Sequence, residues 1–252
     1  MSPLTIAAAQ STSIAGDLPA NIARHRRLIQ AAAEQGVQLL VFPELSLTGY
    51  EPDLAADLAI APDAAVLQPL RELARDMAVT AVVGMPIRLA AEGPVLIGAL
   101  VLAADGSLAV YSKQHLHPGE ERVFAAGSGG VPLTLDDTRV ALAVCADFCH
   151  ASHPAAAAAD GAQVYAAGVL ISPAGYAADS ALLQGYAAAH SMLVLMANHG
   201  GATGGWESAG RSAVWTADGA LLAAAPGVGD GLLIARREVQ GWGAEWRSLA
   251  DA

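Results

Sequence analysis

Lysine occurs only once in this chain of 252 residues, and long hydrophobic runs and blocks of like charge do not occur at all. No apolar run reaches the roughly 18 residues that a membrane-spanning helix needs, which argues against a membrane protein. Because the net charge is −11 and positive charge is scattered, neither nucleic acid nor an anionic membrane is expected as a partner. The two cysteines, Cys145 and Cys149, lie too close in sequence to form a disulfide framework.

Aromatic residues are also scarce, at 5%, whereas the hydrophobic fraction is 54% and the mean hydropathy is +0.41. Much of the apolar content is alanine, which favours a large core of closely packed small side chains over disorder. The first ten residues carry no basic stretch and pass directly into a strand-like run, so we expect no signal peptide and a cytoplasmic location. We expect residues 1–252 to form a single domain.

Strand-like and helix-like segments alternate along the chain. Asp17 is the expected N-cap of the first helix, and Gly36 lies just beyond its end. Isolated β-α units together with two hairpins indicate an α/β protein with mixed sheets. The helices are predicted over residues 19–35, 66–78, 154–159 and 181–191. The strands are predicted over residues 4–9, 37–42, 79–86, 95–103, 107–111, 139–145, 164–171, 193–197 and, as the last, 231–235, with hairpin turns at 105–106 and 218–219.

Four polar side chains come at or just after predicted strand ends: Glu44, Lys113, Cys145 and Asn198. In α/β proteins, ligands bind at the loops beyond the carboxyl ends of strands, so this placement points to a site. Cys145 follows an apolar strand directly. Both a buried core cysteine and a nucleophile fit that position.

A cysteine nucleophile needs a base and a cation nearby. Glu44 ends an apolar strand, where burial would raise its pKa and suit it to proton transfer near pH 7. Lys113, the only lysine, could stabilise an oxyanion or lower the pKa of a thiol. Further along the chain, Glu120 and Glu121 are either a solvated acidic pair or the source of a carboxylate that pairs with Lys113.

The segments around these residues resemble the three signatures of the nitrilase, or carbon–nitrogen hydrolase, superfamily, in that family's order. They are residues 42–45 (FPEL), 111–116 (YSKQHL) and 144–148 (VCADF). Weaker similarity between and beyond them extends the match over nearly the whole chain. The resemblance implies a four-layer αββα sandwich with mixed sheets. It also implies a homodimer or a higher homo-oligomer.

By the same resemblance, Glu44 is the base, Lys113 stabilises the oxyanion, and Cys145 is the nucleophile. The implied reaction is hydrolysis of a small amide or carbamoyl compound through a thioester, with no cofactor. Glu120 matches the family's second glutamate when counted back from the Phe-x-x-Gly element, and Glu121 lies one residue out of that register. Nitrile hydrolysis and acyl transfer to an amine use the same groups and stay open as alternatives.

The segment after Cys145 departs from the family's pattern. Ala146 replaces an aromatic residue but keeps the backbone N–H that could bind an oxyanion, and residues 149–154 (CHASHP) replace an acidic pair. The departure bears on the substrate pocket, whose walls we expect to include Tyr50, His117 and Trp206. The glycine-rich segment that carries Trp206 is either a lid or an ordinary packed loop.

Histidines offer a hypothesis from another class of enzyme. His115 and His117 have the spacing of metal ligands on one face of a strand, and His150 and His153 lie close together in sequence. A metal-dependent hydrolase that uses these residues is the rival interpretation. Loop histidines held by hydrogen bonds are the simpler explanation.

Overall fold

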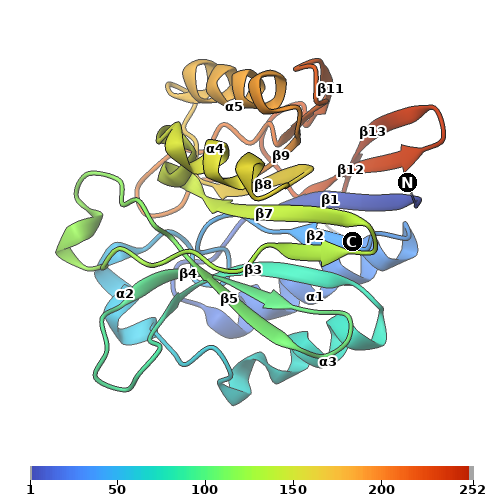
Figure 1. Cartoon of the computed structure of the whole chain (residues 1–252). Coiled ribbons are helices and arrows are strands. Elements are labelled where there is room, and N and C mark those ends of the chain that lie inside the picture. The colour runs from blue at the N-terminus through green and yellow to red at the C-terminus, as the bar shows by residue number, and fades with distance from the viewer. Residues whose placement is uncertain (1, 250–252) are drawn as a thin grey trace.

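The computed structural model describes residues 2–249, in which two mixed β-sheets pack face to face and helices cover their outer faces (Figure 1). This arrangement is the predicted four-layer αββα sandwich. One sheet contains, in spatial order, β13 (Gly241–Ser248), β12 (Gly231–Glu238), β1 (Leu4–Gln10), β2 (Leu39–Val41), β3 (Thr80–Ile87), β4 (Leu96–Leu102) and β5 (Leu108–Ser112). The other contains β11 (Leu221–Ala224), β10 (Ala213–Trp215), β9 (Leu193–Asn198), β8 (Val164–Val169), β7 (Thr138–Val144) and β6 (Leu133–Leu135).

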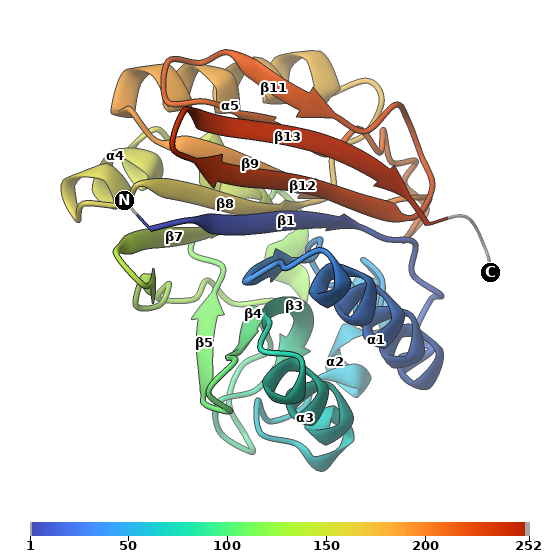
Figure 2. The ribbon, with the colours of Figure 1, turned by 90° about the vertical axis from the view of Figure 1, so that its right-hand side faces the viewer.

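Parallel pairing is confined to the centre of each sheet. Strands β1, β2 and β3 pair in parallel, as do β7, β8 and β9, and the other neighbours are antiparallel. Figure 2 shows β12 lying alongside β1, with β13 next in the sheet. The carboxyl ends of β2, β7 and β8 therefore supply connecting loops in which polar side chains can gather.

Helices α1 (Leu18–Glu34) and α3 (Gln68–Asp76) cover the seven-stranded sheet, and α4 (Ser152–Ala159) and α5 (Tyr176–His190) cover the six-stranded sheet (Figure 1). Shorter helices connect the layers: α2 (Pro52–Leu58) and the 3-10 turns η1 (Ala65–Leu67), η2 (Glu120–Arg122) and η3 (Cys145–Cys149). None of the helices within residues 2–249 is long and apolar enough to cross a membrane.

Strand β1 shows how the core is divided between layers. Ile6 and Ala8 pack between the two sheets, whereas Ala7 and Ala9 pack under the helices of the seven-stranded sheet. This alternation follows from the period of two in a strand, and both faces are apolar because both are buried. Small side chains at these positions allow the layers to approach closely, as the alanine-rich composition predicted.

The predicted start and end of α1 are confirmed. The Asp17 carboxylate accepts a hydrogen bond from the Ala20 N–H at 3.0 Å, and Gly36 adopts a φ of +68° just after the helix. The predicted helix 66–78 begins instead as η1 and continues as α3. The predicted helix 181–191 begins earlier, at Tyr176, where Gly175 precedes it without a side-chain cap.

The prediction that residues 231–235 form the last strand was wrong, because β13 follows as an edge strand. Trp242, Ala244 and Trp246 alternate along β13 and pack against the inter-sheet core, while the residues between them are more polar. Glycines at 241 and 243 masked that pattern. Helix α2 and strand β6 were also not predicted. Both are short, and α2 begins at a proline with no side-chain cap.

Candidate active site

Glu44 follows β2 in a segment that passes between the two sheets. A Cβ added to Gly84 on β3 would lie 2.3 Å from the Leu45 nitrogen, and one added to Gly168 on β8 would lie 2.5 Å from the Phe42 oxygen. Contacts this close are not possible for a real side chain, so glycine on both strands makes room for the segment. The Glu44 side chain is 1% exposed as a result.

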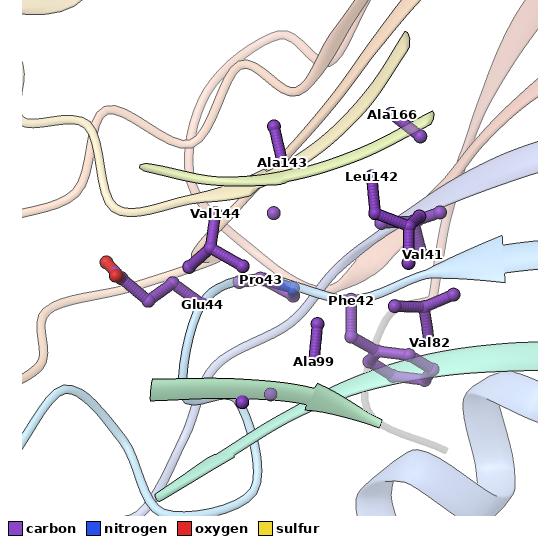
Figure 3. A pocket seen from close by; sticks show the side chains of 13 residues that line it. Val41, Phe42, Pro43, Glu44, Val82, Ala99, Leu142, Ala143, Val144 and Ala166 are labelled. Atoms are coloured by element: carbon purple, nitrogen blue, oxygen red, sulfur yellow. The ribbon is translucent and has the colours of Figure 1, made fainter. Parts of the chain in front are cut away.

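The Glu44 carboxylate points away from the apolar side chains that line a small void between the sheets (Figure 3). That void measures only about 10 Å³ and is bounded mainly by small and branched apolar residues such as Ala99, Val144 and Ala166. A space of this size holds a single water molecule at most, so it cannot be a ligand site. The void therefore belongs to the packed core, and the chemistry lies on the other side of Glu44.

Lys113 follows β5 and extends its ammonium group toward two carboxylates. Its Nζ lies 2.7 Å from Glu44 Oε1 and 2.8 and 2.9 Å from Glu120 Oε1 and Oε2. The Lys113 side chain is 0% exposed. An ammonium without water must be matched by charge and hydrogen bonds, and the two carboxylates provide both.

Glu120, in η2, is the acidic residue that holds Lys113. Its Oε1 also accepts a hydrogen bond from the Tyr50 hydroxyl at 2.8 Å, and its Oε2 accepts one from the His117 N–H at 2.7 Å. The neighbouring Glu121 is exposed and accepts a hydrogen bond from the Gly119 N–H. Of the two acids that the sequence left open, Glu120 is therefore the one that contacts Lys113.

Cys145 comes directly after β7 with a φ of +42°. Non-glycine residues seldom occupy this left-handed region, and when they do the strain often marks a functional position. The residue is partly exposed, and its Sγ lies 3.8 Å from the Leu170 carbonyl oxygen. The turn thus presents the thiol at the end of the strand instead of burying it in the sheet.

Burial and neighbouring charges set the protonation states of the cluster. Burial raises the pKa of Glu44 to about 7, although the Lys113 ammonium opposes this shift. Burial and the Glu44 carboxylate raise the pKa of the Cys145 thiol, which Lys113 opposes in turn. Burial alone would lower the pKa of Lys113, but Glu44, Cys145 and Glu120 together raise it above its ordinary value. The lysine is therefore charged, and the thiol keeps its proton at neutral pH.

The cluster opens into a cavity of about 260 Å³. This cavity brings together Glu44, Glu120 and Cys145 with all four residues that we expected to contact substrate. Lys113 lies behind the wall. The residues that line the cavity are Glu44, Tyr50, His117, Glu120, Cys145, Ala146, Phe148, Cys149, Leu170, Ile171, Ser172, Gly175, Asp179 and Trp206.

Asp147 is a structural member of the site that we did not single out from the sequence. It is fully buried, and its Oδ1 accepts hydrogen bonds from the Gln114 and His115 N–H groups at 3.0 and 2.9 Å. Its Oδ2 accepts from the Tyr111 hydroxyl at 2.7 Å and the Val144 N–H at 3.0 Å. Asp147 therefore ties the segment that carries Lys113 to the turn that carries Cys145. The sequence signal that could have pointed to Asp147 is an acidic residue three positions after the end of an apolar strand.

His199 and Asn198 support the site from β9 and the residue after it. His199 is fully buried, and its Nε2–H donates to the Glu44 carbonyl oxygen at 2.7 Å. Burial lowers the pKa of His199 to about 4, so the ring is neutral. Asn198, expected near the site, bonds the backbone of Ile171 and Gly210 and does not line the cavity. The Asn198 side chain therefore holds together the loops that contain Ile171 and Gly210.

The chain can now be compared with known proteins. The family model described as carbon–nitrogen hydrolase matches residues 5–247. This chain belongs to the carbon–nitrogen hydrolase family.

Several solved structures of an amidase from Nesterenkonia sp. AN1 are similar to this chain. A mutant that carries the acetamide moiety of fluoroacetamide covalently on its active-site cysteine is 30% identical, with a TM-score of 0.82 over 92% of this chain and 89% of that one. A double mutant in complex with acrylamide is 29% identical, with a TM-score of 0.83 over 94% of this chain and 91% of that one.

Two proteins with similar sequences match only part of this chain. A nitrilase from Pyrococcus abyssi is 32% identical over 152 residues, which are 58% of this chain and 57% of that protein. A glutamine-dependent NAD(+) synthetase from Thermotoga maritima is 28% identical over 171 residues, which are 66% of this chain and 29% of that protein. The matched region thus spans less than two thirds of the length of either relative.

The histidines of this chain do not form the metal site of the rival hypothesis. His117 faces the cavity, whereas His115 stacks on His150 with ring centroids 4.0 Å apart. His153 lies between the hydroxyls of Tyr111 and Tyr165. His115 and His117 do not share a strand face, because they follow β5 in an irregular segment. Across residues 2–249, no group of three or more His, Cys, Asp or Glu side chains could hold a metal ion.

Proposed function

We propose that this chain is a cysteine-dependent amidase that hydrolyses the C–N bond of a small amide through a thioester. The observation that carries the proposal is the fully buried Lys113 ammonium, held between Glu44 and Glu120 behind the cavity that exposes Cys145. A buried ion pair is weak evidence for stability, because desolvation offsets most of its attraction. Its position beside a strained cysteine supports a catalytic role.

Glu44 is the base in this proposal. Its pKa of about 7 lets it exchange a proton near neutral pH, and its Oε2 has no hydrogen-bond partner among the described residues. Because the pKa of the Cys145 thiol is raised, the thiol loses its proton to Glu44 as Sγ attacks the carbonyl carbon. A bond forms between sulfur and carbon, and the π electrons of the carbonyl move to its oxygen.

The resulting oxyanion needs preorganised donors. Lys113 can supply the positive charge of a desolvated ammonium that Glu120 holds behind the cavity wall, and Ala146 can supply a backbone N–H donor at the first position after the nucleophile. Donors that need not reorganise during the reaction stabilise the transition state most strongly. Glu120 acts as a positioning residue, because it contacts Lys113 and not the cavity's reacting centre.

The remaining steps return the site to its starting state. Protonated Glu44 gives its proton to the leaving nitrogen, the C–N bond breaks, and ammonia or an amine departs. Water then attacks the thioester while Glu44 takes its proton, and the thiol is released with a carboxylic acid. The covalent acetamide adduct on the cysteine of the similar Nesterenkonia amidase supports a covalent role for cysteine here.

Nitrile hydrolysis and acyl transfer to an amine remain alternatives for the same four residues. The similarity to a nitrilase from Pyrococcus abyssi supports nitrile hydrolysis as an alternative. A homodimer and a cytoplasmic location are further proposals that rest on the sequence. The screen for ammonia release includes nitriles, so that nitrile hydrolysis is tested beside amide hydrolysis.

The test is a screen for ammonia release from small amides, carbamoyl amines and nitriles, with intact-mass measurement of the protein during turnover. We expect an acyl adduct on the wild-type chain and none on Cys145→Ala, which should also lose turnover. Cys149→Ala is the matched control, because Cys149 lines the same cavity and is exposed. Turnover that survives in Cys145→Ala, or is lost equally in both variants, would refute the proposal.

A further inference from the structure

The charge of the cavity wall is negative beyond the cluster of Glu44 and Glu120. Among its lining residues the structure describes no arginine and no lysine, and Asp179 is its one additional carboxylate. Lys113 is occupied by two carboxylates behind the wall. The net charge of the whole chain, −11, adds an attractive field for cations. An anionic substrate would therefore meet repulsion with no arginine to bind it.

Asp179 is free to bind a ligand. It lies in the first turn of α5, with its Oδ2 over the Gly175 backbone, and its carboxylate makes no hydrogen bond or ion pair with the residues that the structure describes. Partial burial raises its pKa, and His117 across the cavity opposes this shift. An acid at this position gains some stability from the helix dipole, but that role does not require a place on the cavity wall.

Aromatic rings stand on the same wall. Trp206 is 53% exposed, which is high for the largest apolar side chain, and it lines the cavity together with Tyr50. The loop that carries Trp206 is fixed to the Tyr50 segment, because Thr203 Oγ1 accepts from the Tyr50 N–H at 2.9 Å and Glu51 Oε1 accepts from the Gly204 N–H at 2.8 Å. The loop is thus packed in place. Exposed aromatic rings attract cations, and these two rings line the same cavity as the Asp179 carboxylate.

We propose that Asp179 and Trp206 form a subsite for a positively charged group, so that the preferred substrates are small amides bearing an ammonium or guanidinium group. This inference rests on the proposed amidase function and names its substrate class. The carboxylate supplies a charge-assisted hydrogen bond to the cation, and the indole face shields it from water. The amide at the other end of the molecule then lies toward Cys145.

The test measures binding separately from turnover. In the Cys145→Ala chain, the dissociation constants of 4-aminobutanamide, butanamide and succinamate are compared with and without Asp179→Asn. We expect the ammonium amide to bind about tenfold more tightly than butanamide, and succinamate to bind most weakly. Asp179→Asn should remove most of that tenfold preference, and Asp179→Glu should restore it. Thermal unfolding of each variant checks that it is folded.

Glu207→Gln is the matched control, since Glu207 is an exposed acid next to Trp206 that does not line the cavity. It should change the preference by less than about threefold, because the charge of an exposed acid is screened by water and salt. Equal binding of the three probes, or a preference unchanged by Asp179→Asn, would overturn the subsite. If the preference holds but the wild-type chain hydrolyses none of the amides, the subsite stands and the amidase proposal fails.

Discussion

Glu44→Gln should change the pH dependence of stability in a way that follows from the burial of this acid. The pKa of Glu44 is about 7 in the folded protein, against an ordinary value of 4.5. Below pH 4.5 both the folded and the unfolded states carry the proton. Between pH 4.5 and 7 only the folded state keeps it, so the free energy of unfolding falls as the pH rises through this window.

The size of the effect follows from the shift. Each pH unit of difference corresponds to about 1.4 kcal/mol, so wild-type protein should lose about 3 kcal/mol of stability from this group between pH 4.5 and 8. Glutamine cannot titrate, and it leaves Lys113 and Glu120 as a balanced ion pair. The stability of Glu44→Gln relative to wild type should therefore rise by about 3 kcal/mol over the same range, even though turnover is lost.

Urea unfolding from pH 4 to 8, followed by tryptophan fluorescence, to which the buried Trp215 contributes, measures this difference. The difference between the two proteins isolates Glu44 from the other groups that titrate in this range. Glu121→Gln is the control, because this acid is exposed, and its curve should follow the wild type within about 0.5 kcal/mol. Parallel curves for wild type and Glu44→Gln would show that Glu44 is an ordinary acid and that the reasoning about its burial is incorrect.

Three further predictions concern Lys113, the histidines and Gly168. Lys113→Arg should reduce turnover about a hundred- to a thousand-fold, because a planar guanidinium cannot replace an ammonium between two carboxylates; near-normal kcat in this variant would remove Lys113 from the mechanism. Burial lowers the pKa of His25 to about 3 and that of His199 to about 4, so their contribution to the free energy of unfolding should be lost as the pH falls from 6.5 through these values. Urea unfolding of His199→Gln should show a smaller acid loss, and an unchanged loss would contradict this assignment. Gly168→Ala should lower both Tm and kcat, because its Cβ would lie 2.5 Å from the Phe42 oxygen. Wild-type values of both in this variant would show that β8 and the segment before Glu44 can move apart without loss of stability or activity.

The sequence predicted those parts of the fold that depend on local patterns. Helix α1 has a cap, an apolar face and a terminal glycine, and its bounds were close to the observed ones. Edge strand β13 was missed because its inward-facing residues are separated by glycine and charged residues, although it pairs with the preceding strand β12 across a short turn. The start of a helix that has no side-chain cap, such as α5, cannot be located from the local sequence.

The site was predictable only to the level of residue identity. Three motifs in order placed Glu44, Lys113 and Cys145 in one hypothesis, and the register of the Phe-x-x-Gly element favoured Glu120 over Glu121. The contact of Glu120 with Lys113 itself was seen only in the structure. The hydrogen bonds of Asp147 join segments that are more than thirty residues apart, as their sequence separations show. Such long-range contacts depend on the packing of the two sheets, which a local pattern does not encode.

The division of the site between the two sheets has a consequence for how the proposed activity tolerates mutation. Glu44 and Lys113 extend from strands of one sheet, and Cys145 extends from a strand of the other. Ala99, from one sheet, and Ala166, from the other, both line the small void between the sheets (Figure 3). A larger residue at either position would alter the spacing of the layers, and a misplacement of about 1 Å can reduce a reaction rate about a hundredfold. Turnover should therefore be more sensitive to the spacing of the two sheets than Tm is. Core substitutions that hardly change Tm should still lower turnover.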